Sequence, residues 1–372
     1  MIIRTTAALL LVFSVAAAVG ASAALAAPGP NRGREAFEQI CATCHGADGK
    51  GAPGRENLKV AIPDFSDCAF ASREPDADWF AVAHEGGPVR GFSPLMPPHG
   101  ASLGAETLQL VIAHVRTFCT DARWPAGELN LPRAQITEKA FPEDEAVIEF
   151  AANAEHETTA SMELIYEKRF GPRRQIEVAV PFALQENASG AKLGGLGDIA
   201  LGAKYALWHS KARGGIVSLA GEVVVPTGER DRGLGDGTVV LEPALLVGKL
   251  LPRDGFLYAQ LLGEFPLDEQ RGDPEAQLRV ALGKSFFEDD GFGREWAPML
   301  EFVATRVFAR GAPNQWEWDL APQMQLALNR RQHVRLSLGV RVPVGDGARF
   351  RPTRALLYVL WDWYDGGLTD GW

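Results

Sequence analysis

Two cysteines and a histidine stand close together in the run Cys41-Ala-Thr-Cys44-His45. At this C-x-x-C-H spacing, two thiols can bond to the vinyl groups of a porphyrin, and the histidine that follows can present its imidazole to the iron. The sequence therefore predicts one covalent haem c at Cys41 and Cys44, with His45 as an iron ligand. The alternatives are a redox-active thiol pair or half of a zinc site. A redox pair usually lies in a βαβ context and structural zinc needs further paired ligands, and the sequence shows neither context.

A second iron ligand is expected on a downstream loop that can reach the opposite face of the porphyrin. The run from Gly91 to His99, Gly-Phe-Ser-Pro-Leu-Met-Pro-Pro-His, supplies a soft thioether between prolines that stiffen the backbone. We therefore predict Met96 as the second ligand, a pairing with histidine that raises the haem potential. The alternatives are that Met96 only fills a gap in the core, or that His99 or His84 binds the iron.

Two more cysteines, Cys68 and Cys119, are not needed for this site. In an oxidising compartment they can form one disulfide bond, and we predict that they do. The bond would close a loop of about 50 residues, which the chain-entropy model values at roughly 4 kcal/mol. The alternative is two unpaired, buried thiols.

Helices must position these side chains. Apolar residues at helical spacing lead into the C-x-x-C-H motif, and apolar residues between positions 105 and 119 recur every three or four places, which predicts an amphipathic helix. A shorter helix is predicted from 76 to 84, because two glycines follow it. Three residues of this shorter helix are expected in the core or the haem pocket: Trp79, Phe80 and Val82.

This order of elements resembles a class I monohaem cytochrome c over residues 31–121: a helix, Cys-Ala-Thr-Cys-His-Gly, a Trp-bearing helix, a Ser-Pro-Leu-Met-Pro loop and a final helix. The resemblance implies an all-α fold around a largely buried haem that cycles between ferrous and ferric iron. It also implies that Cys41 and Cys44 form the thioether bonds, that His45 is the proximal ligand and that Met96 is the distal ligand.

The first 26 residues read as a secretory signal peptide. Arg4 precedes an apolar run from Ala7 to Val19, and small residues then end in Ala24-Leu-Ala26. The apolar run is shorter than the roughly 20 residues that a membrane-spanning helix needs. We therefore expect export of the chain and removal of residues 1–26.

Composition limits the remaining possibilities. Removing 26 of the 372 residues leaves 346, enough for more than one domain. Hydrophobic residues make up 46% and charged residues 23%, as in folded globular chains. The formal net charge is −10, which argues against a nucleic acid partner.

After the first domain the pattern changes. Residues 122–145 contain three X-Pro pairs without a sustained period and read as a linker, whereas residues 146–372 alternate apolar and polar side chains as β-strands do. Most strands are about ten residues long, enough for a tilted strand to cross a bilayer. We expect about twelve strands, near 146–154, 161–169, 174–183, 197–208, 215–226, 238–250, 255–266, 276–287, 296–307, 315–328, 333–344 and 353–363.

A soluble sandwich and a transmembrane barrel share this alternation, but the polar face favours the barrel. Aromatic residues lie toward strand ends, as in a membrane girdle, and long and short connections alternate, apart from a short one near 155–159 and a long one near 288–295. Lys249, Lys284 and Arg306 fall on the apolar face, where charges are tolerated only near the membrane interfaces. The charged residues expected to line a wet lumen are Glu163, Glu167, Glu177, Asp198, Lys204, Glu222, Glu242, Glu264, Arg279, Glu301, Glu317, Asp319, Arg335, Arg341 and Arg354.

Two glycine-rich segments, from Leu193 to Tyr205 and from Gly221 to Gly228, resemble the outer-membrane family associated with meta-pathway phenol degradation. The resemblance implies a bacterial barrel of transporter type in outer-membrane lipid. The sequence thus predicts a multidomain α + β chain, with an all-α cytochrome c domain followed by an antiparallel transmembrane β-barrel. An even strand number places both barrel ends on one side, so we expect the haem domain in the periplasm.

The function expected is electron transfer to or from a redox partner protein or a small electron donor or acceptor. We expect no enzyme, because the sequence contains no catalytic triad, phosphate-binding loop or dinucleotide fingerprint. Peroxidase activity is a weaker idea, since it needs an iron position that Met96 would occupy. The alternative function is an outer-membrane channel or transporter with the haem domain as a redox gate or plug.

Overall fold

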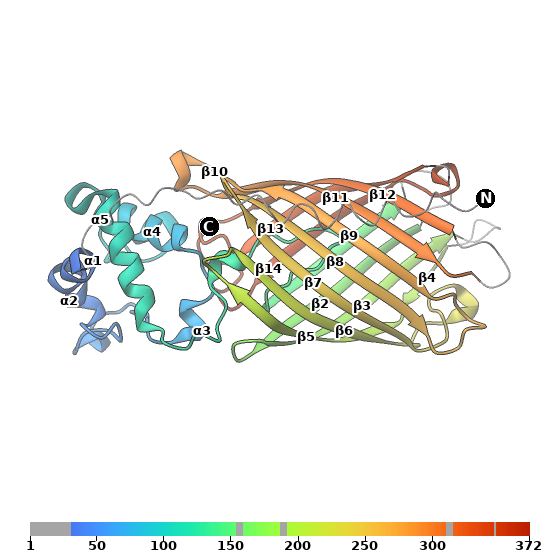
Figure 1. Cartoon of the computed structure of the whole chain (residues 1–372), viewed down its shortest axis with the longest axis horizontal. Coiled ribbons are helices and arrows are strands. Elements are labelled where there is room, and N and C mark those ends of the chain that lie inside the picture. The colour runs from blue at the N-terminus through green and yellow to red at the C-terminus, as the bar shows by residue number, and fades with distance from the viewer. Residues whose placement is uncertain (1–30, 154–158, 187–191, 310–314, 346) are drawn as a thin grey trace, which may run out of the picture.

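The computed structural model describes residues 31–153, 159–186, 192–309, 315–345 and 347–372. The expected signal peptide lies outside these residues. The described chain forms a helical domain at one end of a β-barrel, and the C-terminus lies where the two parts meet (Figure 1). No helix in these ranges is long and apolar enough to span a membrane.

The helical domain begins with one continuous helical run, formed by α1 (Asn31–Ala36), the π-helical turn η2 (Phe37–Cys41) and α2 (Ala42–His45). It continues with α3 (Cys68–Ala71), α4 (Asp76–Glu85) and α5 (Gly100–Val115), which confirms an all-α domain. Gly33 lets α1 cross α5 closely, since a Cβ there would lie 2.2 Å from the Leu110 carbonyl oxygen. Short 3-10 turns lie at η3 (Arg55–Asn57), η4 (Gly87–Arg90), η5 (Arg116–Phe118) and η6 (Gly127–Leu129).

The barrel closes because β9 pairs with β11 and β1 pairs with β14, every pair being antiparallel. This confirms the predicted closed sheet. Its twelve strands, within the described ranges, are β1 (Glu145–Asn153), β2 (Thr159–Phe170), β3 (Arg174–Glu186), β5 (Ile199–Ser210), β6 (Gly215–Val225), β7 (Val240–Leu251), β8 (Gly255–Pro266), β9 (Glu275–Lys284), β11 (Glu295–Val307), β12 (Gln315–Ala327), β13 (Val334–Val344) and β14 (Arg354–Asp362).

Two short strands extend this frame. β4 (Lys192–Leu196) pairs with the end of β3, and β10 (Phe286–Phe287) pairs with β11. The sequence pattern places the fourth strand from 197 on and gives no sign of β4. Asp198, expected on the lumen wall, instead lies at the break between β4 and β5, where its carboxylate accepts hydrogen bonds from the backbone N–H groups of Gly228 and Asp236, 2.8 Å each.

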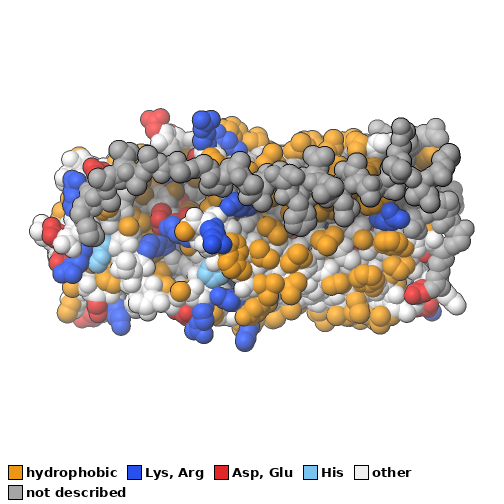
Figure 2. Space-filling view, in the orientation of Figure 1, with side chains coloured by type: hydrophobic (Ala, Val, Ile, Leu, Met, Phe, Trp, Pro, Cys, Tyr) orange, Lys and Arg blue, Asp and Glu red, His pale blue; other side chains and the backbone are white. Residues whose placement is uncertain are grey.

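The barrel exposes apolar side chains and buries charged ones. Apolar side chains cover its outer surface (Figure 2). Leu261 is 57% exposed, whereas Glu301 and Asp319 are 0% and 2% exposed. In water this arrangement would be unfavourable, but lipid around the outside and polar groups within make it favourable.

The barrel interior holds a segment of the chain itself. Residues 129–144, here called the lumen segment, belong to the expected linker and lead into β1. Their hydrogen bonds reach strands all around the wall: Glu143 N–H to Gln175 of β3, the Ala140 carbonyl to Ser218 of β6, the Leu131 carbonyl to Tyr258 of β8, Thr137 N–H to Glu301 of β11, and the Arg133 carbonyl to Tyr358 of β14.

Candidate functional site

The three residues of the C-x-x-C-H motif lie on the last turns of the first helical run. Cys41 ends η2, while Cys44 and His45 end α2, and Gly46, with φ of 74°, turns the chain away. Cys41 packs against the cluster of Phe37, Val111 and Val115. Both thiols are free. One helical turn therefore presents two unbonded thiols and one imidazole to the same region of the domain.

The His45 ring is half-buried, and one of its two nitrogens has no polar partner among the described residues. It stacks on Phe65 with ring centroids 4.9 Å apart, and its Nδ1 atom is buried without a hydrogen-bond partner among the described residues. Burial, and then the nearby His99, lower the pKa of His45. Burial, and then Cys44, raise the pKa of the Cys41 thiol to about 11. Such an environment keeps the imidazole neutral, which is the form that binds metal.

Aromatic side chains line the region next to His45. Phe65 lies 5.3 Å from Trp79 between ring centroids, and Trp79 lies 5.6 Å from Phe70. The Arg116 guanidinium covers the Trp79 ring, 3.8 Å from its centroid, and donates to the Glu74 carbonyl and to Asp76 at 2.7 Å each. Trp79 was expected here, whereas nothing in the sequence distinguishes Phe65 or Arg116 from ordinary surface residues.

The loop that carries Met96 is fixed to the end of α4. Gly87 N–H donates to the Met96 carbonyl at 2.9 Å, and His99 N–H donates to the Ala83 carbonyl at 3.0 Å. Gly86 has φ of 85°, and a Cβ there would lie 3.0 Å from the Met96 carbonyl oxygen, so the approach requires glycine. The Met96 side chain is half-buried. The prolines thus act together with two backbone hydrogen bonds to hold the loop.

The two alternative histidines lie in different surroundings. His99 directly precedes α5 and is close enough to His45 to lower its pKa. His84 instead pairs with Glu85 at 2.7 Å, and its ring stacks on Phe292 of the barrel with centroids 5.0 Å apart. Of the two, His99 is thus the one whose charge is felt at His45, while His84 packs against a barrel loop.

Cys68 and Cys119 form a disulfide, with Cα atoms 5.0 Å apart. The bond joins the start of α3 to the residue that follows η5. It therefore ties the loop that carries Phe65 to the end of the C-terminal helix.

Turns at one end of the barrel and the C-terminal tail hold the helical domain. The contacts are Lys211 with Asp76 at 2.5 Å and with Glu128 at 2.7 Å, Arg90 with the Phe292 carbonyl, Gln332 with Asp78 at 2.9 Å, Arg331 with the Gly91 carbonyl at 3.1 Å, and Arg73 with Asp365 at 3.4 Å. The long connection near 288–295, a departure from the expected pattern, carries Phe292 and so makes one of these contacts. The cavity beneath the domain encloses only about 70 Å³.

These residues fit a covalently bound haem. Its attachment needs two free thiols three residues apart and a histidine next to the second, and the buried His45 nitrogen has no partner among the described residues. Phe65, Phe70 and Trp79 supply the apolar wall that a porphyrin needs. The donor set is thus that of a haem c site, while the number of haems and their covalent bonds belong to the proposal below.

Two family models match the chain. Residues 28–115 match the family described as cytochrome c oxidase, cbb3-type, subunit III, and residues 145–256 match the family described as putative MetA-pathway of phenol degradation. The first match covers most of the helical domain and the second covers half of the barrel. The chain therefore joins an N-terminal cytochrome c domain to a closed, twelve-stranded antiparallel β-barrel that resembles an outer-membrane family.

Several solved barrels are similar in shape. The KdgM porin is 9% identical over 58% of this chain and 98% of its own, with a TM-score of 0.40. An outer membrane channel from Pseudomonas putida F1 is 12% identical over 58% of this chain and 94% of its own, with a TM-score of 0.43. At these values the likeness carries no argument about function. A search of curated proteins finds no match to the chain.

Proposed function

We propose that this protein is a c-type cytochrome that carries electrons in the periplasm and is held in the outer membrane by its barrel. One observation carries the proposal. A buried imidazole nitrogen without a partner among the described residues and two free thiols lie on the same helical turns, and the imidazole stacks on Phe65, which packs against Trp79. The partner is a redox protein or a small electron donor or acceptor.

In this proposal Cys41 and Cys44 hold one haem through thioether bonds, and His45 and Met96 hold its iron. Bound haem supplies an iron that cycles between ferric and ferrous states. The protein side chains do the rest. Phe65 and Trp79 exclude water from the site, and the hydrogen bonds that fix the Met96 loop keep the thioether in place at low entropy cost.

A haem-stained gel tests both halves of the proposal. Inner- and outer-membrane fractions are run with and without heating. The stain should stay with the chain under denaturing conditions, fall in the outer-membrane fraction and shift in mobility on heating, because folded barrels migrate differently. Cys41→Ser/Cys44→Ser should lose the stain, while Cys68→Ser/Cys119→Ser, which removes as many thiols elsewhere, should keep it. Equal staining of both variants would reject the site.

The second iron ligand is tested by Met96→Ala. The variant should give a high-spin, ligand-accessible haem at lower potential, because the thioether stabilises ferrous iron. An unchanged low-spin spectrum would move the ligand to a histidine. In that case His99→Ala, compared with His84→Ala, would identify it.

The short turns support the periplasmic side for the helical domain. Barrels of this kind have short periplasmic turns and long outer loops. Among the described connections, 171–173 and 252–254 are short and lie at the end that holds the helical domain, whereas 226–239 is long and lies at the other end. Surface protease on intact cells should cut residues 227–237 and spare the haem domain. Loss of haem stain from those cells would favour a surface-displayed cytochrome.

A channel with a redox gate is the second candidate, and the lumen segment is the observation that bears on it. That segment and the docked helical domain occupy one end of the barrel. Single-channel recording in a planar bilayer separates the two candidates. An electron carrier should stay closed in both oxidation states, whereas a gated channel should open in one of them.

A further inference from the structure

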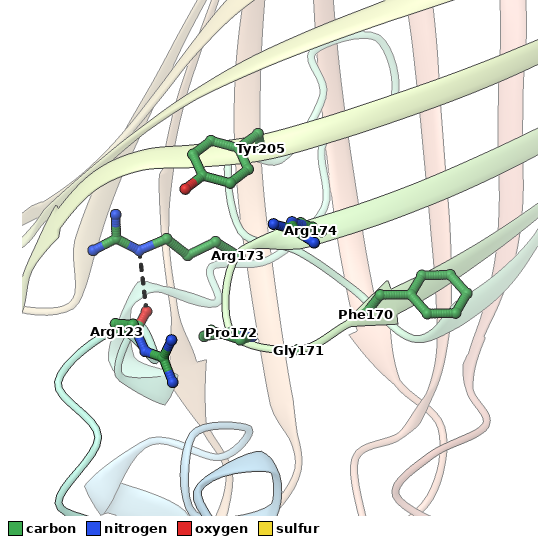
Figure 3. A pocket seen from close by; sticks show the side chains of 7 residues that line it. All are labelled: Arg123, Phe170, Gly171, Pro172, Arg173, Arg174 and Tyr205. Carbon is green, nitrogen blue, oxygen red and sulfur yellow. Dashed lines mark hydrogen bonds between the residues drawn. The ribbon is translucent and has the colours of Figure 1, made fainter.

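A pocket of about 470 Å³ opens at the rim of the barrel next to the helical domain. Its walls come from the turn between β2 and β3, from β5 and from the chain just after the helical domain (Figure 3). Three of the side chains that line it are arginines, Arg123, Arg173 and Arg174, and two are aromatic, Phe170 and Tyr205. The pocket lies away from the haem site residues and serves none of the functions above.

The positive charge of this pocket is largely unpaired. Arg123 forms a bidentate pair with Asp121 at 2.8 and 2.9 Å. Arg173 reaches only backbone carbonyls, those of Arg123 at 3.4 Å and Leu207 at 3.5 Å, both at the limit of a hydrogen bond. The Arg174 side chain has no hydrogen bond or ion pair within the described ranges. Two guanidinium groups are therefore left for an external anion.

The pocket sits where the lipid-facing surface ends. In the sheet register Arg174 lies opposite both Phe170 and Tyr205, which are 49% and 42% exposed on the outer face. Ile176, two residues along the same strand, is 47% exposed on that face. The tyrosine hydroxyl points to the same side of the pocket as the Arg173 guanidinium (Figure 3). Aromatic rings and arginines gather at this depth in membrane proteins because lipid headgroups lie there.

We propose that this pocket binds the phosphate group of an anionic phospholipid from the membrane leaflet on the helical-domain side. The planar guanidinium groups of Arg173 and Arg174 match the geometry of phosphate oxygens, and the Tyr205 hydroxyl can donate one more hydrogen bond. Phe170 and Ile176 offer apolar surface along which an acyl chain can lie. The lipid would thus be held beside the junction of the two domains, at Arg123.

Lipid retention by the full chain tests the assignment. The protein is purified in neutral detergent, incubated with palmitoyl-oleoyl phosphatidylglycerol and observed by native mass spectrometry. Arg173→Gln/Arg174→Gln should retain this lipid about tenfold less well, since hydrogen bonds to charged groups are lost. The matched control is Arg213→Gln/Arg253→Gln, which removes two exposed charges from neighbouring turns outside the pocket and should retain the lipid as the wild type does.

Three outcomes would overturn the proposal. Equal loss in the pocket and control variants would mean that general surface charge attracts the lipid. Equal retention by the wild type and the pocket variant would mean that the pocket binds no lipid. Complete displacement of the lipid by millimolar inorganic phosphate would mean that the site takes a free anion. Retention by the wild type and the control, lost only in the pocket variant and insensitive to phosphate, supports a phospholipid site.

Discussion

The barrel buries many charged side chains and the helical domain few, although both parts also bury apolar clusters. The helical domain encloses Leu108 and Val111, at 1% and 3% exposure, as a protein in water does. The barrel encloses Glu167 and Glu301, at 2% and 0%, and turns Leu201 outward at 50%. The hydrophobic effect acts on both parts, but one part meets water and the other meets lipid on its outer face. A paired charge buried inside the barrel is thus compatible with that environment and not a fault in packing.

Buried charges need partners, and the lumen segment supplies many of them. Its Arg133 lies within 3.2 Å of three carboxylates from the wall, those of Glu145, Glu149 and Glu167. Burying a charge without a partner would be far more costly than leaving it in water. The barrel interior therefore holds paired charges beside apolar clusters, and the chain that leads into it contributes to both.

The largest effect is expected from Glu301→Ala. The Glu301 carboxylate accepts hydrogen bonds from the backbone N–H groups of Gln135 and Ile136 at 3.0 Å each, from Thr137 N–H at 2.7 Å and from the Thr137 hydroxyl at 2.6 Å. Removing the carboxylate leaves these donors without an acceptor, at a cost of about 1–3 kcal/mol each. The free energy of unfolding of the barrel should therefore fall by roughly 5 kcal/mol. The temperature at which the gel mobility shifts measures the loss of barrel stability. Single-channel recording shows whether the lumen segment leaves the barrel interior.

Glu317→Ala is the matched control for that variant. Glu317 is also a lumen carboxylate, but its partner is Arg351 at 3.1 Å and not the lumen segment. Its loss should change the shift temperature much less. Equal effects of the two substitutions would show that any lumen carboxylate matters and that the segment has no special anchor.

Cys68→Ser/Cys119→Ser should act on the helical domain alone. Opening a loop with a sequence separation of 51 residues removes a constraint worth roughly 4 kcal/mol on the chain-entropy model. Thermal unfolding followed by haem absorbance should shift downward, while the temperature of the barrel mobility shift stays the same. Alkylation before and after reduction should differ by two thiols in the wild type. A parallel loss in both parts would show that the two unfold together.

A third effect separates the two environments directly. Leu261→Arg places a charge near the middle of β8 on the outer face, which costs about 2–4 kcal/mol in a bilayer, while Phe265→Arg near the strand end should cost at most about 1 kcal/mol. Leu108→Ala leaves a cavity in the helical core, at about 2–5 kcal/mol, and should leave the barrel unchanged. Barrel folding yield into vesicles and haem-domain unfolding measure the two losses. Tolerance of Leu261→Arg would contradict a lipid-facing surface.

Local pattern predicted most of the fold. Alternation located all twelve strands to within a few residues, because one face of each meets lipid and the other a polar lumen. Spacing alone selected Cys41, Cys44 and His45, which the structure brings onto one helical turn. The disulfide expected from the cysteine count is present, since export leaves two thiols outside the motif.

The local sequence pattern does not predict contacts between segments that are far apart in the chain. The lumen segment looks like a proline-punctuated linker, because its partners, such as Glu301 and Tyr358, are more than 160 residues away in the chain. Phe292 stacks on His84 of the helical domain only because the two domains dock, and a local hydrophobic period does not predict docking. In the sequence, Asp198 falls on the polar side of the alternating pattern. In the structure its carboxylate instead accepts a hydrogen bond from the loop at Gly228.

The smallest effect concerns the junction between the two parts and its dependence on pH. Glu74 lies there beside Asp78 of α4, Asp362 and Asp365 of the C-terminal end, and Arg335 of β13, and burial followed by Asp78 raises its pKa to about 8. A carboxyl with a raised pKa is protonated in the docked state and ionised in the separated state between its usual pKa, about 4.5, and 8. Docking therefore takes up a proton, so it should weaken several-fold for each unit that the pH rises through that window and change little above it.

Glu74→Gln stays neutral in both states and should flatten the dependence in part, because Asp365, whose pKa burial also raises, remains. Hydrogen exchange of residues 73–78 at pH 6 and pH 9, corrected for intrinsic rates, measures the opening, with Glu56→Gln on the exposed surface as the control. If the wild type and Glu74→Gln open equally at both pH values, the proton at this junction does not influence how the two domains hold together.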